Sequence, residues 1–298
     1  MIEVVSAASR VLQRATQERN MKLSVQVRLI EAGRTIKDNV KWAKDHGVEG
    51  IELTAEPHED LKRTAEAVLN VLPVSSICGM FDEQGQLVFD LLAPEVEKRR
   101  QAVELLKANL RLAGQVGAAG QVVPPMFGPP RVPDLSPMAD PAKIQDELMV
   151  AHCRVLGPFA AKHNTKVLLE PLNRYEQSYM RTQEHGARIM RRAKVKGVAL
   201  LSDLFHMHIE ETDTPATLRA VAGKYTGSMH LADNTRMEPG TGDIDFVAAF
   251  RALAKVRYTG YMAYECAISG SSRKQRTRNL AKSLRYMRAC IAKAKRAR

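Results

Sequence analysis

Four apolar segments in the second half of the chain each end on a side chain that can bind a metal ion. Glu170, Asp203, His230 and Glu265 close the segments that begin at residues 167, 198, 227 and 261. They follow one another at intervals of about 30 residues, and each interval holds a helix-like segment. Continuous apolar runs of this length are typical of parallel strands that are buried on both faces. The spacing therefore predicts four consecutive β-α units.

The same alternation extends back to residue 22. Further strands are expected at 22–28, 50–53, 74–79 and 120–123, and helices at 35–45, 59–72, 94–113, 140–162 and from 273 onward. Gly47 and Gly114 are expected to end the first and third of these helices. Eight β-α units can close into a (β/α)8 barrel, the TIM barrel. No linker divides the chain, so we expect one α/β domain over residues 21–298 with a basic C-terminal helix. Residues 1–20 are interpreted as an N-terminal helical extension.

Barrels of this kind carry their chemistry at the C-terminal ends of the strands. Glu170, Asp203, His230 and Glu265 are all expected there, so four neighbouring strands would direct them to one point. Three carboxylates brought together without a cation would cost several kcal/mol in repulsion and desolvation. An oxygen-rich site with one nitrogen favours Mn²⁺ or Mg²⁺, tolerates Co²⁺ and suits zinc less well. We therefore predict one divalent metal ion at this point.

Several segments resemble a known family. Residues 170–176, 202–211 and 230–236 resemble the ketose 3-epimerases of the D-tagatose/D-psicose type, which are part of the xylose isomerase-like TIM-barrel superfamily. Residues 239–246, Pro-Gly-Thr-Gly-Asp-Ile-Asp-Phe, are typical of the wider superfamily. The resemblance covers the last four strands well and is weak over residues 1–160.

This resemblance implies a metal-dependent sugar isomerase or epimerase. The four strand-end residues would bind Mn²⁺ or a similar ion, and Glu170 and Glu265 would also exchange protons with opposite faces of the sugar. The side chains that would contact the substrate around O1, O2 and O3 are Glu176, His206 and Arg236. Related enzymes are often dimers or tetramers, so by analogy the resemblance also implies a homodimer or homotetramer.

The implied chemistry agrees with the residue types. Epimerisation next to a ketone requires the removal of a weakly acidic C–H proton, and a metal that holds two sugar oxygens stabilises the resulting enediolate. One carboxylate takes the proton from one face, and a second carboxylate returns a proton to the other.

The three substrate contacts have structural alternatives. Glu176 could instead pair with Arg174, and His206 could orient a metal ligand. Arg236 could balance a neighbouring carboxylate, either Asp233 or Glu238.

Two loops at the same end of the expected barrel bear on the substrate. Ser271 and Arg273 open the last helix, where backbone N–H groups, hydroxyls and cations favour phosphate, so the substrate could be a sugar or a sugar phosphate. An ordinary capping loop explains the same residues equally well. Residues 124–141 hold half of the 14 prolines and are expected to form a lid or pocket wall, with Met126 and Phe127 above the substrate.

The net charge of +12 comes largely from the basic segment 273–298. A solvated helix face explains it better than attraction to nucleic acid. The four cysteines do not form metal-binding pairs, which favours reduced thiols in a cytoplasmic protein, and Cys266 is expected in the core or the pocket wall. The sequence has neither a membrane-spanning run nor a secretion signal.

Other functions remain open. Hydroxypyruvate isomerases, other aldose–ketose isomerases, and dehydratases or lyases of keto sugars or inososes would use the same metal and base. An abasic-site endonuclease of the same superfamily needs three zinc ions and many histidines, whereas this chain has eight, four of them away from strand ends. A non-catalytic binding subunit is a third class.

Overall fold

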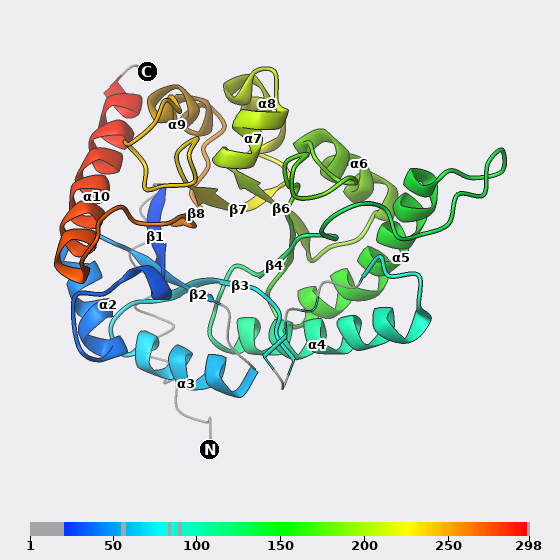
Figure 1. Ribbon diagram of the computed structural model, residues 1–298, viewed down its shortest axis with the longest axis horizontal. Helices are drawn as coiled ribbons and strands as arrows, with labels where there is room; N and C mark the ends of the chain where they lie inside the picture. The colour runs from blue at the N-terminus through cyan, green and yellow to red at the C-terminus, as the bar shows by residue number, and fades with distance from the viewer. Residues whose placement is uncertain (1–20, 55–57, 83–84, 87, 89–90, 297–298) are drawn as a thin grey trace.

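The computed structural model describes residues 21–54, 58–82, 85–86, 88 and 91–296. The extension predicted at residues 1–20 lies outside the described residues. The described chain forms a closed barrel of eight parallel strands in sequential order, in which the last strand pairs with the first (Figure 1). The α/β fold, a (β/α)8 TIM barrel, is therefore confirmed.

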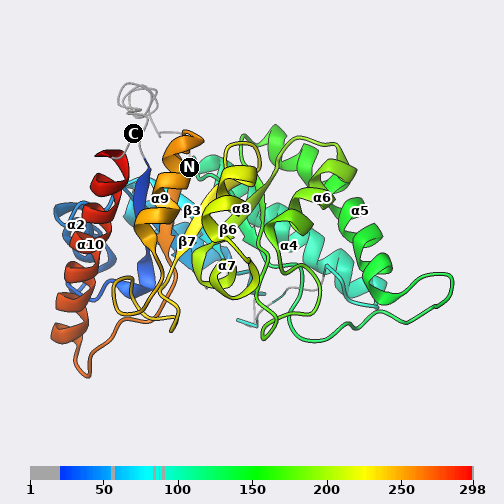
Figure 2. The ribbon, with the colours of Figure 1, turned by 90° about the horizontal axis from the view of Figure 1, so that it is seen from above.

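The strands are short, and the helices surround them (Figures 1 and 2). The strands are β1 (Lys22–Gln26), β2 (Gly50–Thr54), β3 (Val74–Cys78), β4 (Gln121–Val123), β5 (Val167–Leu169), β6 (Val198–Asp203), β7 (Thr226–Leu231) and β8 (Tyr261–Tyr264). The helices are α2 (Ile36–Asp45), α3 (His58–Leu69), α4 (Val96–Gln115), α5 (Pro141–Lys162), α6 (Gln183–Ala193), α7 (Leu204–Glu210), α8 (Thr214–Val221), α9 (Phe246–Lys255) and α10 (Arg273–Arg296), with a 3-10 turn η1 (Val27–Leu29) after β1.

Local signals start and stop the helices. Thr35 and Asp38 form a capping box at the start of α2, and Asp140 caps α5 ahead of Pro141. Gly47 ends α2 with φ of 78°, a left-handed conformation that glycine adopts without steric cost.

The prediction that Gly114 ends its helix is wrong. Gly114 lies within the last turn of α4, and Gly117, with φ of 72°, follows the helix instead. A β-carbon on Gly114 would lie 2.1 Å from the carbonyl oxygen of His163. This glycine is thus needed for the close approach of α4 to the end of α5, and it is not a stop signal.

The inside of the barrel combines an apolar layer with buried polar groups. Val122, Leu168, Ala199 and Leu201 form a small apolar cluster, separate from the two larger clusters that also include helix residues. Fully buried polar side chains on the strands are Ser24, Ser75, Ser76, Glu52, Gln121, Ser202, Asp203, Ser228 and His230. Buried polar groups need partners, and several of these meet at the carboxyl ends of the strands.

The proline-rich segment divides into two parts. Pro124 and Phe127 line a cavity at the carboxyl end of the barrel. The outer part projects away from the barrel ahead of α5 (Figures 1 and 2), where Leu135 and Met138 are exposed. Only the first part therefore forms a wall of this cavity.

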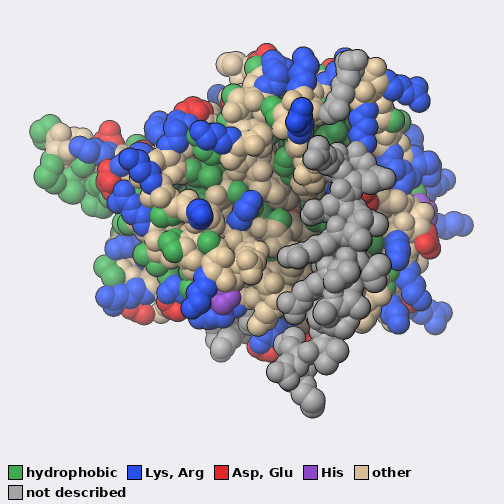
Figure 3. Space-filling model, turned by 180° about the vertical axis from the view of Figure 1, so that it is seen from behind, with side chains coloured by type: hydrophobic (Ala, Val, Ile, Leu, Met, Phe, Trp, Pro, Cys, Tyr) green, Lys and Arg blue, Asp and Glu red, His purple; other side chains and the backbone are tan. Residues whose placement is uncertain are grey.

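Helix α10 is amphipathic and basic. Leu284 and Met287 are buried on its inner face, while Arg276 pairs with Glu31. Figure 3 shows Lys and Arg side chains spread over the rear face, without gathering into one stripe. Across the described residues, we find no helix with both the length and the apolarity to cross a membrane.

Candidate active site

Four side chains from the last four strands meet at the carboxyl end of the barrel. Glu170 follows β5, Asp203 ends β6, His230 lies near the end of β7, and Glu265 follows β8. Asp203 and His230 are register partners on adjacent strands. One potential ligand atom from each of the four residues lies within 4.8 Å of the others. This is a group that could hold a metal ion.

His230 is the centre of this cluster. Its Nδ1 lies 3.2 Å from Glu170 Oε1 and 3.0 Å from Glu265 Oε2. Its Nε2 lies 3.0 Å from an oxygen of Glu52, a fully buried residue of β2. Glu52 also accepts hydrogen bonds from Gln26 and Ser76, at 2.9 and 2.6 Å. The ring is therefore held with Nδ1 facing the other carboxylates.

The buried charges shift one another's pKa values. Burial, reinforced by the charge of Glu265, raises the pKa of Glu170 to about 8. Burial also acts to raise the pKa of Glu265, but the charges of His230 and Arg236 outweigh it and hold that pKa below its usual value. A divalent cation among these carboxylates would lower the pKa of both.

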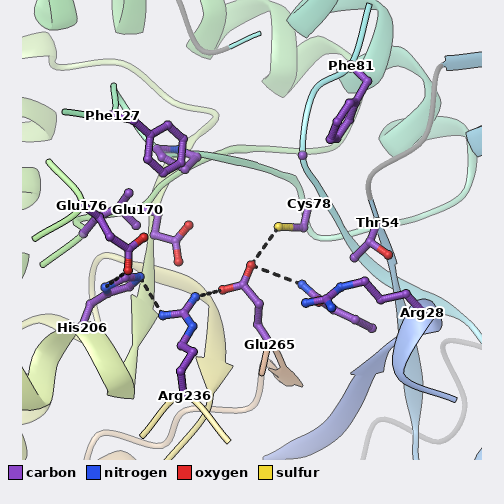
Figure 4. A pocket seen from close by; sticks show the side chains of 14 residues that line it. Arg28, Thr54, Cys78, Phe81, Phe127, Glu170, Glu176, His206, Arg236 and Glu265 are labelled. Atoms are coloured by element: carbon purple, nitrogen blue, oxygen red, sulfur yellow. Dashed lines mark hydrogen bonds and ion pairs between the residues drawn. The ribbon is translucent and has the colours of Figure 1, made fainter. Parts of the chain in front are cut away.

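Arg236 and His206 extend the cluster on the side of β6 and β7. Arg236 lies 3.2 Å from Asp203 and 2.7 Å from Glu265, and its Nη1 lies 3.0 Å from His206 Nε2. The backbone N–H of Asn173 donates to His206 Nδ1 at 3.1 Å. Burial lowers the pKa of His206, which favours its neutral ring. Both side chains line the cavity with Glu170 and Glu265 (Figure 4).

The structure excludes two of the alternative pairings. Arg174 pairs with Glu210, 2.8 Å away, and leaves Glu176 in the cavity wall, where it accepts from Asn173. Asp233 accepts from backbone N–H groups such as that of Gly240, and Glu238 accepts from the N–H and hydroxyl groups of Ser269. Arg236 pairs instead with Asp203 and Glu265.

A cavity of about 220 Å³ opens above the cluster. Its lining includes four residues that the sequence analysis did not predict as part of the site: Gln26, Arg28, Thr54 and Cys78. Gln26 donates to both Glu52 and Glu265 and accepts from Arg28, while Cys78 donates to Glu265 at 3.3 Å. Of the two residues proposed to cover a substrate, Phe127 lines the cavity, whereas Met126 is buried in the core.

The loop predicted as a phosphate site makes other contacts. Arg273 donates to the backbone carbonyl groups of Glu31 and Gly33, and Ser271 donates to Gln275. Neither Ser271 nor Arg273 is among the residues that line the 220 Å³ cavity. The guanidinium group of Arg273 thus links α10 to the loop after η1. These contacts favour the interpretation of residues 271–273 as an ordinary capping loop.

The Pro-Gly-Thr-Gly-Asp run wraps around the Asp233 carboxylate. Asp233 accepts hydrogen bonds from the backbone N–H groups of Asn234, Gly240, Thr241 and Ile244 at 2.8 to 3.2 Å. Burial acts to raise the pKa of Asp233, but these and neighbouring backbone N–H groups outweigh it and lower the pKa. The loop also carries Arg236 with φ of 60°, an uncommon conformation for this residue type.

Replacing Asp233 by asparagine is expected to destabilise the fold by about 3 kcal/mol, because a neutral amide cannot replace several charge-assisted hydrogen bonds. Denaturant unfolding at neutral pH measures this. Since the folded pKa is depressed, the stabilisation is present above about pH 4 and is lost as pH falls through the folded pKa. The difference between wild type and variant should shrink accordingly. The control is Asp243→Asn in the same loop, where the side chain is 69% exposed; equal losses in the two variants would refute the prediction.

Comparison with known proteins places the chain in a family. The xylose isomerase-like TIM barrel family matches residues 40–290. The chain belongs to the xylose isomerase-like TIM barrel family. A 3-dehydro-D-guloside 4-epimerase of Escherichia coli (strain K12) is 31% identical over 259 residues, which are 86% of this chain and 95% of the relative.

Two further similar proteins bear on substrate specificity. A crystal structure of a 3-keto-D-glucoside 4-epimerase from E. coli in apo form has a TM-score of 0.75 and 29% identity, and the match covers 91% of this chain and 100% of that one. A D-psicose 3-epimerase of Ruminiclostridium cellulolyticum is 32% identical, but only over 119 residues, 40% of each chain. The sequence match to this 3-epimerase therefore extends over less of the chain than the sequence match to the 4-epimerase.

Proposed function

We propose that the chain inverts a carbinol carbon next to the carbonyl group of a keto sugar and depends on one divalent metal ion. It is an enzyme that acts on carbohydrates, a sugar epimerase of the xylose isomerase-like superfamily. The observation that carries the proposal is the convergence of Glu170, Asp203, His230 and Glu265 on one point, together with a cavity of about 220 Å³ that Glu170 and Glu265 line.

The donor set fits a divalent ion. Glu170, Asp203, His230 and Glu265 offer three carboxylates and one imidazole nitrogen, a combination suited to Mn²⁺, Mg²⁺ or Co²⁺, with Mn²⁺ our first choice. When bound, such an ion would polarise the substrate carbonyl and stabilise negative charge on the sugar oxygens.

The protein's own groups supply the proton transfers. One of Glu170 and Glu265 removes the proton from the carbon next to the carbonyl, and the C–H electron pair moves into an enediolate. The other glutamate donates a proton to the opposite face of the same carbon, which forms a C–H bond in the inverted configuration. Arg236 and His206 border the cavity where they can donate to the oxygens that gain charge, and Glu176 can accept from a sugar hydroxyl.

Two carbons are candidates for inversion. The local resemblance to ketose 3-epimerases favours C3 of a ketose. The relative matched over nearly its whole length is a 4-epimerase of a 3-dehydro sugar, in which the inverted carbon is likewise adjacent to the carbonyl. The same two-base reaction serves both, and we favour the keto glycoside because that sequence match covers 86% of this chain.

The test is exchange with solvent. The Mn²⁺-loaded protein is incubated in D₂O with free ketoses, ketose phosphates and 3-keto glycosides, and the products are analysed by NMR and mass spectrometry. We expect deuterium at one carbon next to the carbonyl, together with the epimer. An isomerase would move the carbonyl group and a lyase would release water or a fragment; exchange in none of the sugars would contradict the proposal.

We also propose that Glu52 positions His230 for the metal. A carboxylate on the far nitrogen of a metal-binding histidine fixes the ring and raises its basicity. Glu52→Gln is expected to weaken Mn²⁺ binding about 10–100-fold, measured by calorimetry. Exposed Glu104 on α4 provides the control, Glu104→Gln. Unchanged affinity would contradict this role, as would a stoichiometry of two ions, because Glu52, Cys78 and His230 also form a potential ligand group.

The remaining partner assignments follow from this function. The partner is a small sugar or sugar phosphate, the cellular location is proposed as the cytoplasm, and the assembly as a homodimer or homotetramer, which sedimentation equilibrium tests. Nucleic-acid enzymology has little support, since His230 is the only histidine in the two potential ligand groups found among the described residues.

A further inference from the structure

A second cavity adjoins the proposed reaction site. It measures about 380 Å³ and shares Arg28, Arg236 and Glu265 with the first cavity. Its other lining residues are Thr235, Met237, Cys266 and Ala267. Because Glu265 borders both cavities, a molecule held between the two catalytic glutamates can extend directly into the second space.

The walls of the second cavity are well defined. Met237 and Ala267 form a bridge between the loop after β7 and the segment after β8, and the Ala267 N–H donates to the Arg236 carbonyl at 2.9 Å. Arg28 lies on the opposite side of Glu265 from Glu170 (Figure 4), and its Nε donates to Gln26 at 2.9 Å. The second cavity is therefore bounded by backbone-linked segments of the barrel rim.

The lining chemistry suits a sugar ring. Arg28 and Thr235 offer polar groups at the edge, while Met237, Ala267 and Cys266 offer apolar surface. A pyranose ring likewise has hydroxyl groups around its edge and C–H groups on its faces. The first cavity, at about 220 Å³, lies below the range of roughly 300–1,000 Å³ typical of drug-sized ligand pockets, and it suits one sugar unit.

We propose that the second cavity binds a glycosidic substituent, so that the substrate is a keto glycoside with a second sugar ring rather than a free ketose. The proposal rests on the epimerase function above and adds the second sugar ring and the cavity that binds it. Thr235 and Met237 then determine specificity, since they contact the substituent and not the reacting carbon. Arg28 supplies hydrogen bonds to its hydroxyl groups.

Blocking the second cavity tests the proposal. Thr235 is exposed at its rim, and Thr235→Trp would fill it without altering the metal or proton-transfer residues. The matched control is Ser271→Trp, an exposed position that lines neither cavity. The substrates are methyl 3-keto-glucoside and a 3-keto disaccharide whose oxidised ring carries the second glucose.

For Thr235→Trp, we expect kcat/KM for the disaccharide to fall at least tenfold, while the methyl glycoside changes by less than twofold. Ser271→Trp should leave both unchanged. Equal losses on both substrates, or no loss on the disaccharide, would overturn the proposal. The proposal would also be overturned, in favour of an anion site, if Arg28→Met lowered kcat/KM for a ketose phosphate but left kcat/KM for the disaccharide unchanged.

A turnover-independent measurement separates this proposal from the epimerase function. Binding of the unoxidised disaccharide and of methyl glucoside is compared by calorimetry in wild type and Thr235→Trp. If wild type binds the disaccharide more tightly than methyl glucoside and Thr235→Trp does not, the second cavity binds the second sugar ring. This result supports the proposal even if neither keto sugar is epimerised. If methyl 3-keto-glucoside is epimerised but the disaccharide binds no better than methyl glucoside, the epimerase function stands and the glycoside subsite fails.

Discussion

Replacing Glu265 by glutamine is expected to lower kcat by about 10²–10⁴-fold, the usual contribution of a group that transfers a proton in the transition state. Glutamine keeps an amide oxygen near Arg236 and His230 but cannot accept the substrate proton. Glu170→Gln should show a loss of similar size, because the second glutamate acts on the opposite face. Initial rates with the sugar that exchanges deuterium most rapidly measure both effects.

A loss of proton transfer must be distinguished from a loss of folding or of bound metal. Each variant is loaded with Mn²⁺, its metal content is measured, and its thermal midpoint is compared with that of wild type. Glu184→Gln on α6 provides the control, since that side chain is 67% exposed and does not line the cavity. A metal-loaded, folded Glu265→Gln enzyme with wild-type kcat would eliminate the two-glutamate mechanism.

Removal of the divalent ion by chelation is expected to abolish turnover and to lower the thermal midpoint. The ion binds the folded state and not the unfolded chain, so at a free concentration 100-fold above Kd it contributes about 2.7 kcal/mol. The carboxylates of Glu170, Asp203 and Glu265 also lose the charge that offsets their repulsion. Differential scanning calorimetry with and without Mn²⁺ measures the stability change.

Re-addition of Mn²⁺ should restore both activity and midpoint in the wild type. Asp203→Asn, which lacks one of the four ligand groups, should respond to Mn²⁺ only at much higher concentrations. Full activity in a protein shown by elemental analysis to be free of metal would rule out metal dependence.

Several features could be predicted from local sequence alone. Apolar runs, capping residues such as Thr35 and Asp140, and the left-handed Gly47 are short-range signals, and the strands and helices they mark are present. The adjacency of β5 to β8 follows from their order, because consecutive parallel strands pair in a barrel. That is why the sequence alone predicts that the four strand-end residues meet.

The site residues that come from the first strands of the barrel could not be predicted from local sequence. Glu52 is a single acid within an apolar strand, and its contact with His230 spans 178 residues of chain. Gln26 reaches Glu265 across 239 residues because β1 pairs with β8 when the barrel closes. The only signal in the sequence was a single acidic residue, Glu52, within an apolar strand. That signal does not show that Glu52 contacts His230 or what the contact does.

The sequence by itself determined the repeating β-α pattern and the identity of the side chains at the ends of the last four strands, since both are encoded over a few neighbouring residues. Only the tertiary structure decided which groups surround those side chains. Barrel closure brings Gln26, Arg28, Glu52 and Cys78 to the site, while the packing of α10 commits Arg273 to backbone carbonyls. These contacts depend on the distances between strands and helices far apart in the chain, which local periodicity does not specify.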